Sequence, residues 1–193
     1  MRQGIILSLM CVLSFSAFAQ EDTILSSRLE KYMLLTKQLD FEKLMDYIHP
    51  DLFKIAPKEK VIETFQNAFN NEMIEIIIDS TSVSDISPSF IYHEVVYKKI
   101  DYYMSMQLKF KDTSVWEDDE FVKSMSEQLK KGFENMNINY IKEKNYFRID
   151  GINIMFAIKD KRQSVWMFLG YDKRQATIVE ILFPGEVLTH FNL

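Results

Sequence analysis

The chain has 193 residues, with 28 Asp and Glu against 23 Lys and Arg, and a formal net charge of −5. This acidic balance argues against general nucleic-acid binding, which depends on neutralising phosphates with basic side chains. Removal of residues 1–19 would leave 174 residues (193 − 19), a length typical of a single domain. We therefore expect a signal peptide at residues 1–19 and one domain at residues 20–193.

The first nineteen residues have the layout of a secretory signal peptide. Arg2 opens a short basic segment, residues 5–15 are apolar, and residues 17–19 (Ala-Phe-Ala) supply small side chains at a cleavage site. The apolar run is shorter than the ~20 residues that a membrane-spanning helix needs. We expect cleavage between Ala19 and Gln20, and a protein that is secreted or periplasmic and has no membrane span.

Cysteine chemistry is confined to this predicted signal peptide, because the only cysteine is Cys11. After cleavage the chain would have no disulfide, no thiolate metal ligand and no cysteine nucleophile. Lipidation of Cys11 is disfavoured, since a lipobox requires a small residue directly before the cysteine and Met10 stands there.

Helical patterns dominate the first third of the predicted domain. Apolar residues at three-and-four spacing predict a helix over residues 25–39. Asp40 can cap a short second helix at residues 41–48, which ends before a proline. Pro57 is well placed as the first residue of a third helix.

The pattern then changes to that of strands. Residues 73–78 are rich in β-branched side chains and predict a first strand, and residues 90–110 predict a long second strand. The apolar side chains of the second strand change parity at Lys98 and Lys99. This change predicts a β-bulge that bends the strand.

A further helix and a meander of strands are expected after the second strand. Ser114 and Glu117 have the spacing of a capping box at the start of a helix. The Asp150-Gly151 pair is the strongest short-range signal for a β-hairpin. Strands are expected at residues 147–149, 152–158, 165–169 and 178–183, followed by a short tail at residues 186–191.

This order predicts an α+β domain, in which N-terminal helices pack on one face of a curved, cone-like antiparallel sheet and an extra helix is inserted after the second strand. The element order, the bent second strand, and the patterns at residues 40–47 and 183–188 resemble the nuclear-transport-factor-two-like (NTF2-like, or cystatin-like) superfamily. Small secreted bacterial proteins of unknown function have the same layout. The resemblance covers most of residues 23–191 and implies a ligand pocket between the helices and the sheet.

No catalytic, cofactor-binding or metal-binding residues are predicted. His49, His93 and His190 lack the spacing of metal ligands. The acidic residues 117–120 lack the spacing of a calcium loop and are typical of the first turn of a helix. Enzymes of the resembled superfamily, such as ketosteroid isomerase, imply an acid or base inside the cone. The adjacent residues Asp101 and Tyr102 cannot cooperate in that way unless the bulge extends to them, because neighbouring strand residues point to opposite faces.

Four residues are candidates for the lining of an apolar pocket. Trp166 and Phe168 are two positions apart on a predicted strand and so share one face. Tyr102 and Met104 would approach them from the long second strand. The alternative for these side chains is a filled core between the sheet and the helices.

The sequence therefore predicts a secreted domain without evident catalytic residues that binds a small apolar ligand or another protein of the cell envelope. Two alternatives are an isomerase- or dehydratase-like enzyme with a buried acid or base, and an assembly module that forms a homodimer through its sheet. No cofactor is implied. The sequence leaves open the identity of the ligand, any catalysis, the oligomeric state, and the choice between periplasm and medium.

Overall fold

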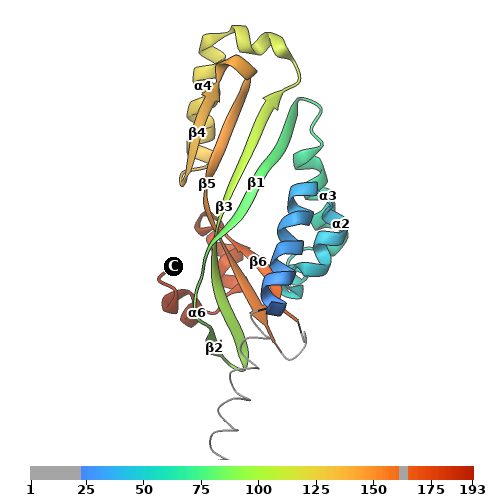
Figure 1. Cartoon of the computed structure of the whole chain (residues 1–193), viewed down its shortest axis with the longest axis vertical. Coiled ribbons are helices and arrows are strands. Elements are labelled where there is room, and N and C mark those ends of the chain that lie inside the picture. Colours follow the sequence, from blue (N-terminus) through green and yellow to red (C-terminus); the bar gives the residue numbers. More distant parts are fainter. Residues whose placement is uncertain (1–22, 161–164) are drawn as a thin grey trace, which may run out of the picture.

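A computed structural model describes residues 23–160 and 165–193 (Figure 1). The predicted signal peptide, its cleavage site and Cys11 lie outside the described residues. Within the described ranges the fold is α+β, as expected: helices pack against a long, curved antiparallel sheet that does not close. The strands are β1 (Ile74–Ile86), β2 (Phe90–Tyr92), β3 (Val95–Phe110), β4 (Met136–Ile141), β5 (Tyr146–Lys159) and β6 (Met167–Tyr171).

The helices flank the sheet in three groups. The N-terminal group is a helix over residues 23–38 with α2 (Phe41–Leu44) and α3 (Lys58–Phe69), the middle one is α4 (Asp119–Gly132), and the C-terminal pair is α5 (Ala176–Leu182) and α6 (Gly185–His190). Short 3-10 helices connect these elements: η1 (Met45–Tyr47), η2 (Pro50–Lys54), η3 (Thr113–Glu117), η4 (Lys142–Lys144) and η5 (Lys173–Gln175). No described helix combines the length and the apolar character that crossing a membrane requires.

Strands β3 and β5 form the spine of the sheet. Their register is unbroken from the pair Val96–Lys159 to the pair Leu108–Phe147. The outer edge of β3 pairs with β1 and, near its start, with β2, whereas the outer edge of β5 pairs with β4 and then β6. The sheet narrows and twists strongly between these two parts (Figure 1). We call the level between β4 and β6 the waist. The part of the molecule that contains α4 is the upper part, and the part that contains β6 is the lower part.

Both faces of the lower part are covered by helices. On one face, Met155 packs in a buried cluster with Leu25 and Leu29 of the N-terminal helix. On the opposite face, the neighbouring residue Phe156 packs with Val179 of α5 and with α6. Successive residues of β5 point to opposite faces of the sheet. Because both faces are buried here, this part of the strand is a continuous run of apolar residues rather than an alternation of apolar and polar ones.

The upper part is covered on one face by α4. Met106, Leu108, Phe147 and Ile149 form a buried cluster against which the apolar side of α4 packs. The opposite face of the same strands carries polar side chains. One of them, Gln107, donates a hydrogen bond of 2.7 Å to Asp79 of β1.

The predicted bulge at residues 98–99 is wrong. The pairing of β3 with β5 passes these residues in unbroken register, and the sheet's register shifts lie instead on β1, after Ile78 and after Val83. The parity change has another cause. Tyr97 packs toward the C-terminal helices and Ile100 toward the N-terminal helix, so both parities are apolar where both faces of the sheet are buried.

The predicted second strand is also divided. His93 and Glu94 have φ values of 45° and 65° and form the turn between β2 and β3. Neither residue is a glycine or asparagine, which usually mark such turns. The sequence therefore lacked the usual signal for this hairpin.

The predicted hairpin at Asp150-Gly151 is wrong, because both residues lie inside β5. Gly151 pairs with Met104 of β3 on one side and with Met136 of β4 on the other. A Cβ atom at position 151 would lie 3.1 Å from the Cα of Met136 and 3.1 Å from the carbonyl oxygen of Asn135. The glycine thus permits a close approach of two strands rather than a turn.

The predicted last strand and tail are helices. Residues 178–183 fall mostly in α5 and residues 186–191 mostly in α6. A short apolar run fits a buried helix as well as a strand, and packing of Val179, Leu182 and Val187 against the sheet decides for the helix. Helix α4 also begins later than expected, at the cap Asp118 rather than at Ser114.

A pair of glycine substitutions tests the close approach of β4. Gly151→Ala should lower the free energy of unfolding by ~1–2 kcal/mol, because backbone atoms must give way. Gly170→Ala in β6 meets nothing within 4 Å and should be neutral or stabilise by up to ~1 kcal/mol. Urea denaturation of both variants measures these changes. Equal effects of the two substitutions would contradict the tight packing of β4 on β5.

Candidate functional site

The candidate site lies at the waist, where the outer edge of β5 lacks a partner strand. β4 pairs with β5 as far as Gly151, and β6 pairs from Ile154 onward. Ile152 and Asn153 therefore face a gap between two strands that are otherwise in line. In an antiparallel ladder, alternate residues direct their N–H and C=O groups to opposite neighbours. One of these two residues thus presents its main chain to the gap.

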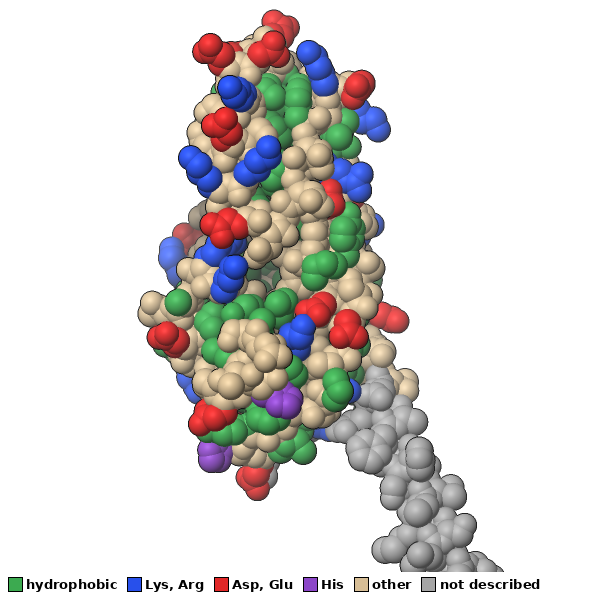
Figure 2. Space-filling model, turned by 90° about the vertical axis from the view of Figure 1, so that its left-hand side faces the viewer, with side chains coloured by type: hydrophobic (Ala, Val, Ile, Leu, Met, Phe, Trp, Pro, Cys, Tyr) green, Lys and Arg blue, Asp and Glu red, His purple; other side chains and the backbone are tan. Residues whose placement is uncertain are grey.

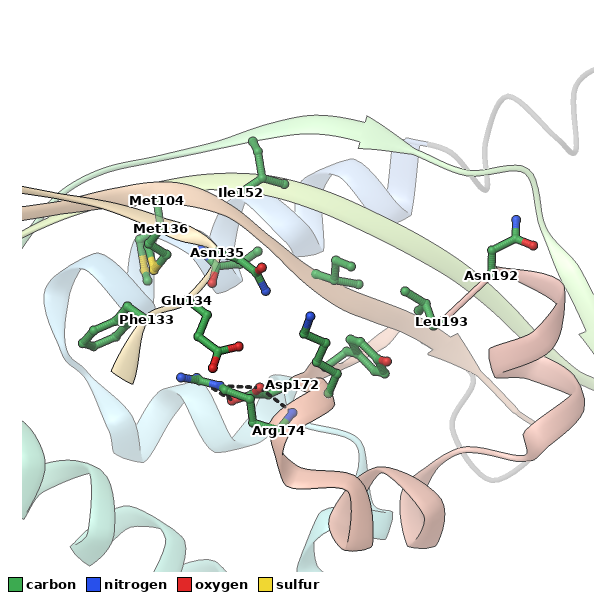
Figure 3. A pocket seen from close by; sticks show the side chains of 14 residues that line it. Met104, Phe133, Glu134, Asn135, Met136, Ile152, Asp172, Arg174, Asn192 and Leu193 are labelled. Atoms are coloured by element: carbon green, nitrogen blue, oxygen red, sulfur yellow. Dashed lines mark hydrogen bonds and ion pairs between the residues drawn. The ribbon is translucent and has the colours of Figure 1, made fainter. Parts of the chain in front are cut away.

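A cavity of about 480 Å³, here called the outer cavity, occupies this gap (Figure 3). Met104 and Met136 lie side by side at one end of it, above the position where Gly151 has no side chain. Glu134 and Lys173 add exposed charges of opposite sign. Figure 2 shows this side of the molecule, with a hollow near its middle that is bordered by charged and hydrophobic side chains. The outer cavity therefore combines apolar and polar surface.

The pair Asp172 and Arg174 forms one wall of the outer cavity. The Nε atom of Arg174 lies 2.9 Å from Oδ1 of Asp172, and Nη2 lies 2.7 Å from Oδ2. The Nη1 atom donates to the carbonyl oxygen of Gly132, the last residue of α4. Such terminal carbonyls have no partner within their own helix. Arg174 therefore joins the upper and lower parts of the molecule across the gap.

The Arg174 guanidinium beside Asp172 also lowers the pKa of that carboxyl below its usual value. The main-chain N–H of Arg174 donates a further hydrogen bond of 3.0 Å to Oδ1 of Asp172. The carboxylate of Asp172 and the guanidinium of Arg174 thus pair with each other and with main-chain groups of the protein. Together these two side chains form one wall of the outer cavity.

A smaller cavity of about 200 Å³, here called the inner cavity, adjoins the outer one. The two cavities share Asn153, Ile154, Tyr171 and Asp172 as lining residues. The inner cavity is further lined by Gly170 of β6, where an added Cβ would meet open space. Tyr102, Gln175, Ile178, Val179 and Leu182 complete its lining.

Tyr102 and Asn153 bring hydrogen-bonding groups to the inner cavity. They are cross-strand partners on β3 and β5 and share one face of the sheet. Burial raises the pKa of Tyr102 to about 12, so its hydroxyl is protonated at neutral pH. The Nδ2 atom of Asn153 is buried and has no hydrogen-bond partner in the described part of the chain. Burying an amide without a hydrogen-bond partner costs ~1–3 kcal/mol of stability. Asn153 is therefore a candidate for contact with a ligand.

Of the four residues predicted to line one pocket, Tyr102, Trp166 and Phe168 belong to one cluster under the N-terminal helix, and Met104 packs in the upper cluster. Trp166 and Phe168 are 2% and 0% exposed and pack in the cluster with Leu29 of the N-terminal helix. They line neither waist cavity. Tyr102 lines the inner cavity and Met104 the outer one. The sequence could not show this division, because the gap between β4 and β6 depends on where each strand stops pairing.

His49 and Asp160 form a buried contact that their sequence spacing does not reveal. The Nε2 atom of His49 lies 3.4 Å from Oδ2 of Asp160, and both side chains are almost fully buried. The Nδ1 atom accepts a hydrogen bond from the main chain of Asp51. The main-chain N–H of His49 donates to Phe168 at 3.0 Å. Both ring nitrogens therefore face groups of the protein, and His49 connects η2 with β6 and the end of β5.

The waist site suits non-covalent binding of a small molecule. It offers apolar side chains, an amide, a protonated hydroxyl and a segment of free strand edge in one place. Its Asp172 and Arg174 side chains are engaged with each other. Over the described ranges, no three side chains of His, Cys, Asp or Glu gather as metal ligands.

Comparison of the chain with protein-family models, with curated proteins and with solved structures returned no match. The resemblance to the NTF2-like superfamily stays a prediction. The function must therefore be argued from the geometry of the waist.

Replacing Arg174 by Met tests the wall of the outer cavity. The lowered pKa of Asp172 means that its ion pair stabilises the fold above the usual carboxyl pKa. This stabilisation is lost as the pH falls through the lowered value. In Arg174→Met, the Asp172 midpoint in an NMR titration should rise, and stability at neutral pH should fall by up to ~1 kcal/mol, because the pair is partly exposed. An unchanged midpoint would contradict the assigned pairing.

Proposed function

We propose that this chain is an exported domain that binds a small organic ligand at the waist. The observation that carries the proposal is the gap in the outer edge of β5, which holds the outer cavity and adjoins the inner one. The outer cavity falls within the ~300–1,000 Å³ that is usual for ligand pockets. Its lining comes from upper and lower elements, as is common for binding sites between substructures.

The lining supports a ligand with both apolar and polar groups. Met104 and Met136 provide flexible, polarisable surface that adapts to different shapes. Asn153 and the free strand edge provide directional hydrogen bonds. Ile152 is 49% exposed and contributes apolar surface of the outer cavity that a ligand can cover.

A glycine-filling variant tests the proposed binding site. Gly170→Leu should place a side chain into the inner cavity, while Gly185→Leu in α6 is a matched control that also meets open space. We expect fragments from a mixed library of neutral, anionic and cationic compounds to shift the amide NMR signals of Tyr102, Asn153 and Tyr171. Binding should be at least ~10-fold weaker in Gly170→Leu and unchanged in Gly185→Leu.

Two results would contradict the proposal. One is a library in which no fragment shifts the waist signals of the native chain. The other is equal binding to the native chain and to Gly170→Leu, with shifts that map elsewhere.

The export component of the proposal rests on residues 1–19. Their basic start, apolar run and Ala-Phe-Ala site support cleavage before Gln20. Intact-mass analysis of the exported protein should therefore give an unmodified chain that begins at Gln20. A chain that begins at Cys11 with added acyl mass, or an uncleaved chain, would contradict this part.

A further inference from the structure

We propose that the waist recognises a neutral molecule that presents a carbonyl or amide oxygen to Asn153, and that it discriminates against carboxylates. This inference rests on the proposed function and specifies the class of ligand. It follows from three properties of the inner cavity: its unpaired donor, its charge and its shape.

The unpaired donor is the amide of Asn153. Its Nδ2 atom is buried and has no partner among the residues the structure describes, although the side chain lines both cavities. The terminal torsion of asparagine has two broad, nearly equivalent orientations. In the proposed orientation, a half turn of the amide brings Nδ2 to the cavity side, where a ligand oxygen can accept its hydrogen bond, and Oδ1 takes the buried position.

Tyr102 provides a second donor on the same face. Its hydroxyl carries its proton at neutral pH, as an ordinary tyrosine does, and burial raises its pKa further, so it can donate a hydrogen bond. Because Tyr102 and Asn153 are cross-strand partners, their side chains start within ~5 Å of each other. Both residues line the inner cavity, so each can contribute a hydrogen-bond donor to the same ligand.

The charge of the inner cavity favours a neutral oxygen over a carboxylate. None of the described residues that line it is Lys or Arg, and Asp172 contributes a carboxylate to its wall. The nearby Arg174 is already held by Asp172 and by Gly132. Lys173 lines only the outer cavity and is exposed, so a carboxylate in the inner cavity would lose water without gaining a neighbouring cation there and would lie near Asp172, which is costly. A carbonyl or amide oxygen avoids both penalties.

The shape of the cavity indicates an apolar body attached to this oxygen. Gly170 leaves open space on the face of its partner Met155, which Asn153 shares, and the apolar side chains of Ile178, Val179 and Leu182 line the cavity from the other face. A volume of about 200 Å³ accommodates a chain or ring of roughly six carbons. Hexanamide and hexanoate are therefore suitable probes, since they share one apolar chain and differ in the charge of the head group.

The decisive experiment titrates both probes into the native chain at pH 7 and follows the amide NMR signals of the waist. Hexanamide should bind at least ~10-fold more tightly than hexanoate. Asn153→Leu keeps the shape of the side chain but removes its donor, and it should weaken hexanamide about 10-fold, the equivalent of one hydrogen bond. Asn139→Leu, an exposed position of β4 that lines neither waist cavity, should leave hexanamide binding within twofold.

A second variant guards against a general effect of the leucine. Asn153→Asp replaces the donor by an acceptor and should weaken hexanamide as much as Asn153→Leu does. If hexanoate binds the native chain as tightly as hexanamide, or if Asn153→Leu leaves hexanamide binding intact, the assigned class of ligand is wrong while the proposed function stands. If neither probe nor any library fragment shifts the waist signals, the proposed function itself fails.

Discussion

The uninterrupted pairing of β3 with β5 is the constraint on which the rest of this fold depends. These strands run through the upper and lower parts of the molecule, and β1 follows β3 from the upper part as far as the pair Ile86–Ile100. All three groups of helices pack against side chains of this pair. The strong twist of the sheet directs one nominal face toward α4 above the waist and toward the N-terminal helix below it (Figure 1).

The waist cavities follow from the way in which the outer edge of β5 is shared. Two short strands, β4 and β6, cover that edge from opposite ends and leave Ile152 and Asn153 between them. Arg174 reaches from η5 to the end of α4 and connects the two sides of the gap. The site is therefore built by the junction of two substructures, and its polar groups stand where regular strand pairing is interrupted. An interruption of this kind exposes main-chain donors and acceptors that a ligand can use.

The site carries little net charge, and its residues suit selective binding of a ligand. Its strongest ion pair is internal to the protein, and its inner end presents donors without a cation. Ligand recognition there depends on hydrogen-bond geometry and apolar contact rather than on electrostatic attraction. The buried contact of His49 with Asp160 lies apart from the lining of these cavities and connects loop, strand and 3-10 helix.

The sequence by itself determined the class of the fold and the order of most elements, because these follow from local periodicity. The N-terminal helices, α4, β3 and the two halves of β5 carry a 3.6-residue or two-residue pattern that survives without knowledge of the partners, whereas β4 and the second half of β1 were not expected. The short apolar runs near the C-terminus do not distinguish a helix from a strand, so the segments that form α5 and α6 were expected to be a strand and a tail. Burial on both faces made Tyr97 and Ile100 look like the two sides of a bulge.

Only the tertiary structure decided the site. Gly151 could have formed a turn, and the backbone of Met136 placed against it makes it a point of close strand contact. Asn153 and Gly170 carry no sequence signal, because their importance arises from the ends of two strands far apart in the chain. Tyr102 and Met104 were singled out by parity alone. Tyr102 packs in the same cluster as Trp166 and Phe168, whereas Met104 packs under α4, and this depends on which helix covers each region of the sheet. Local sequence patterns determine which residues form strands and helices, but long-range packing determines where a sheet leaves a gap.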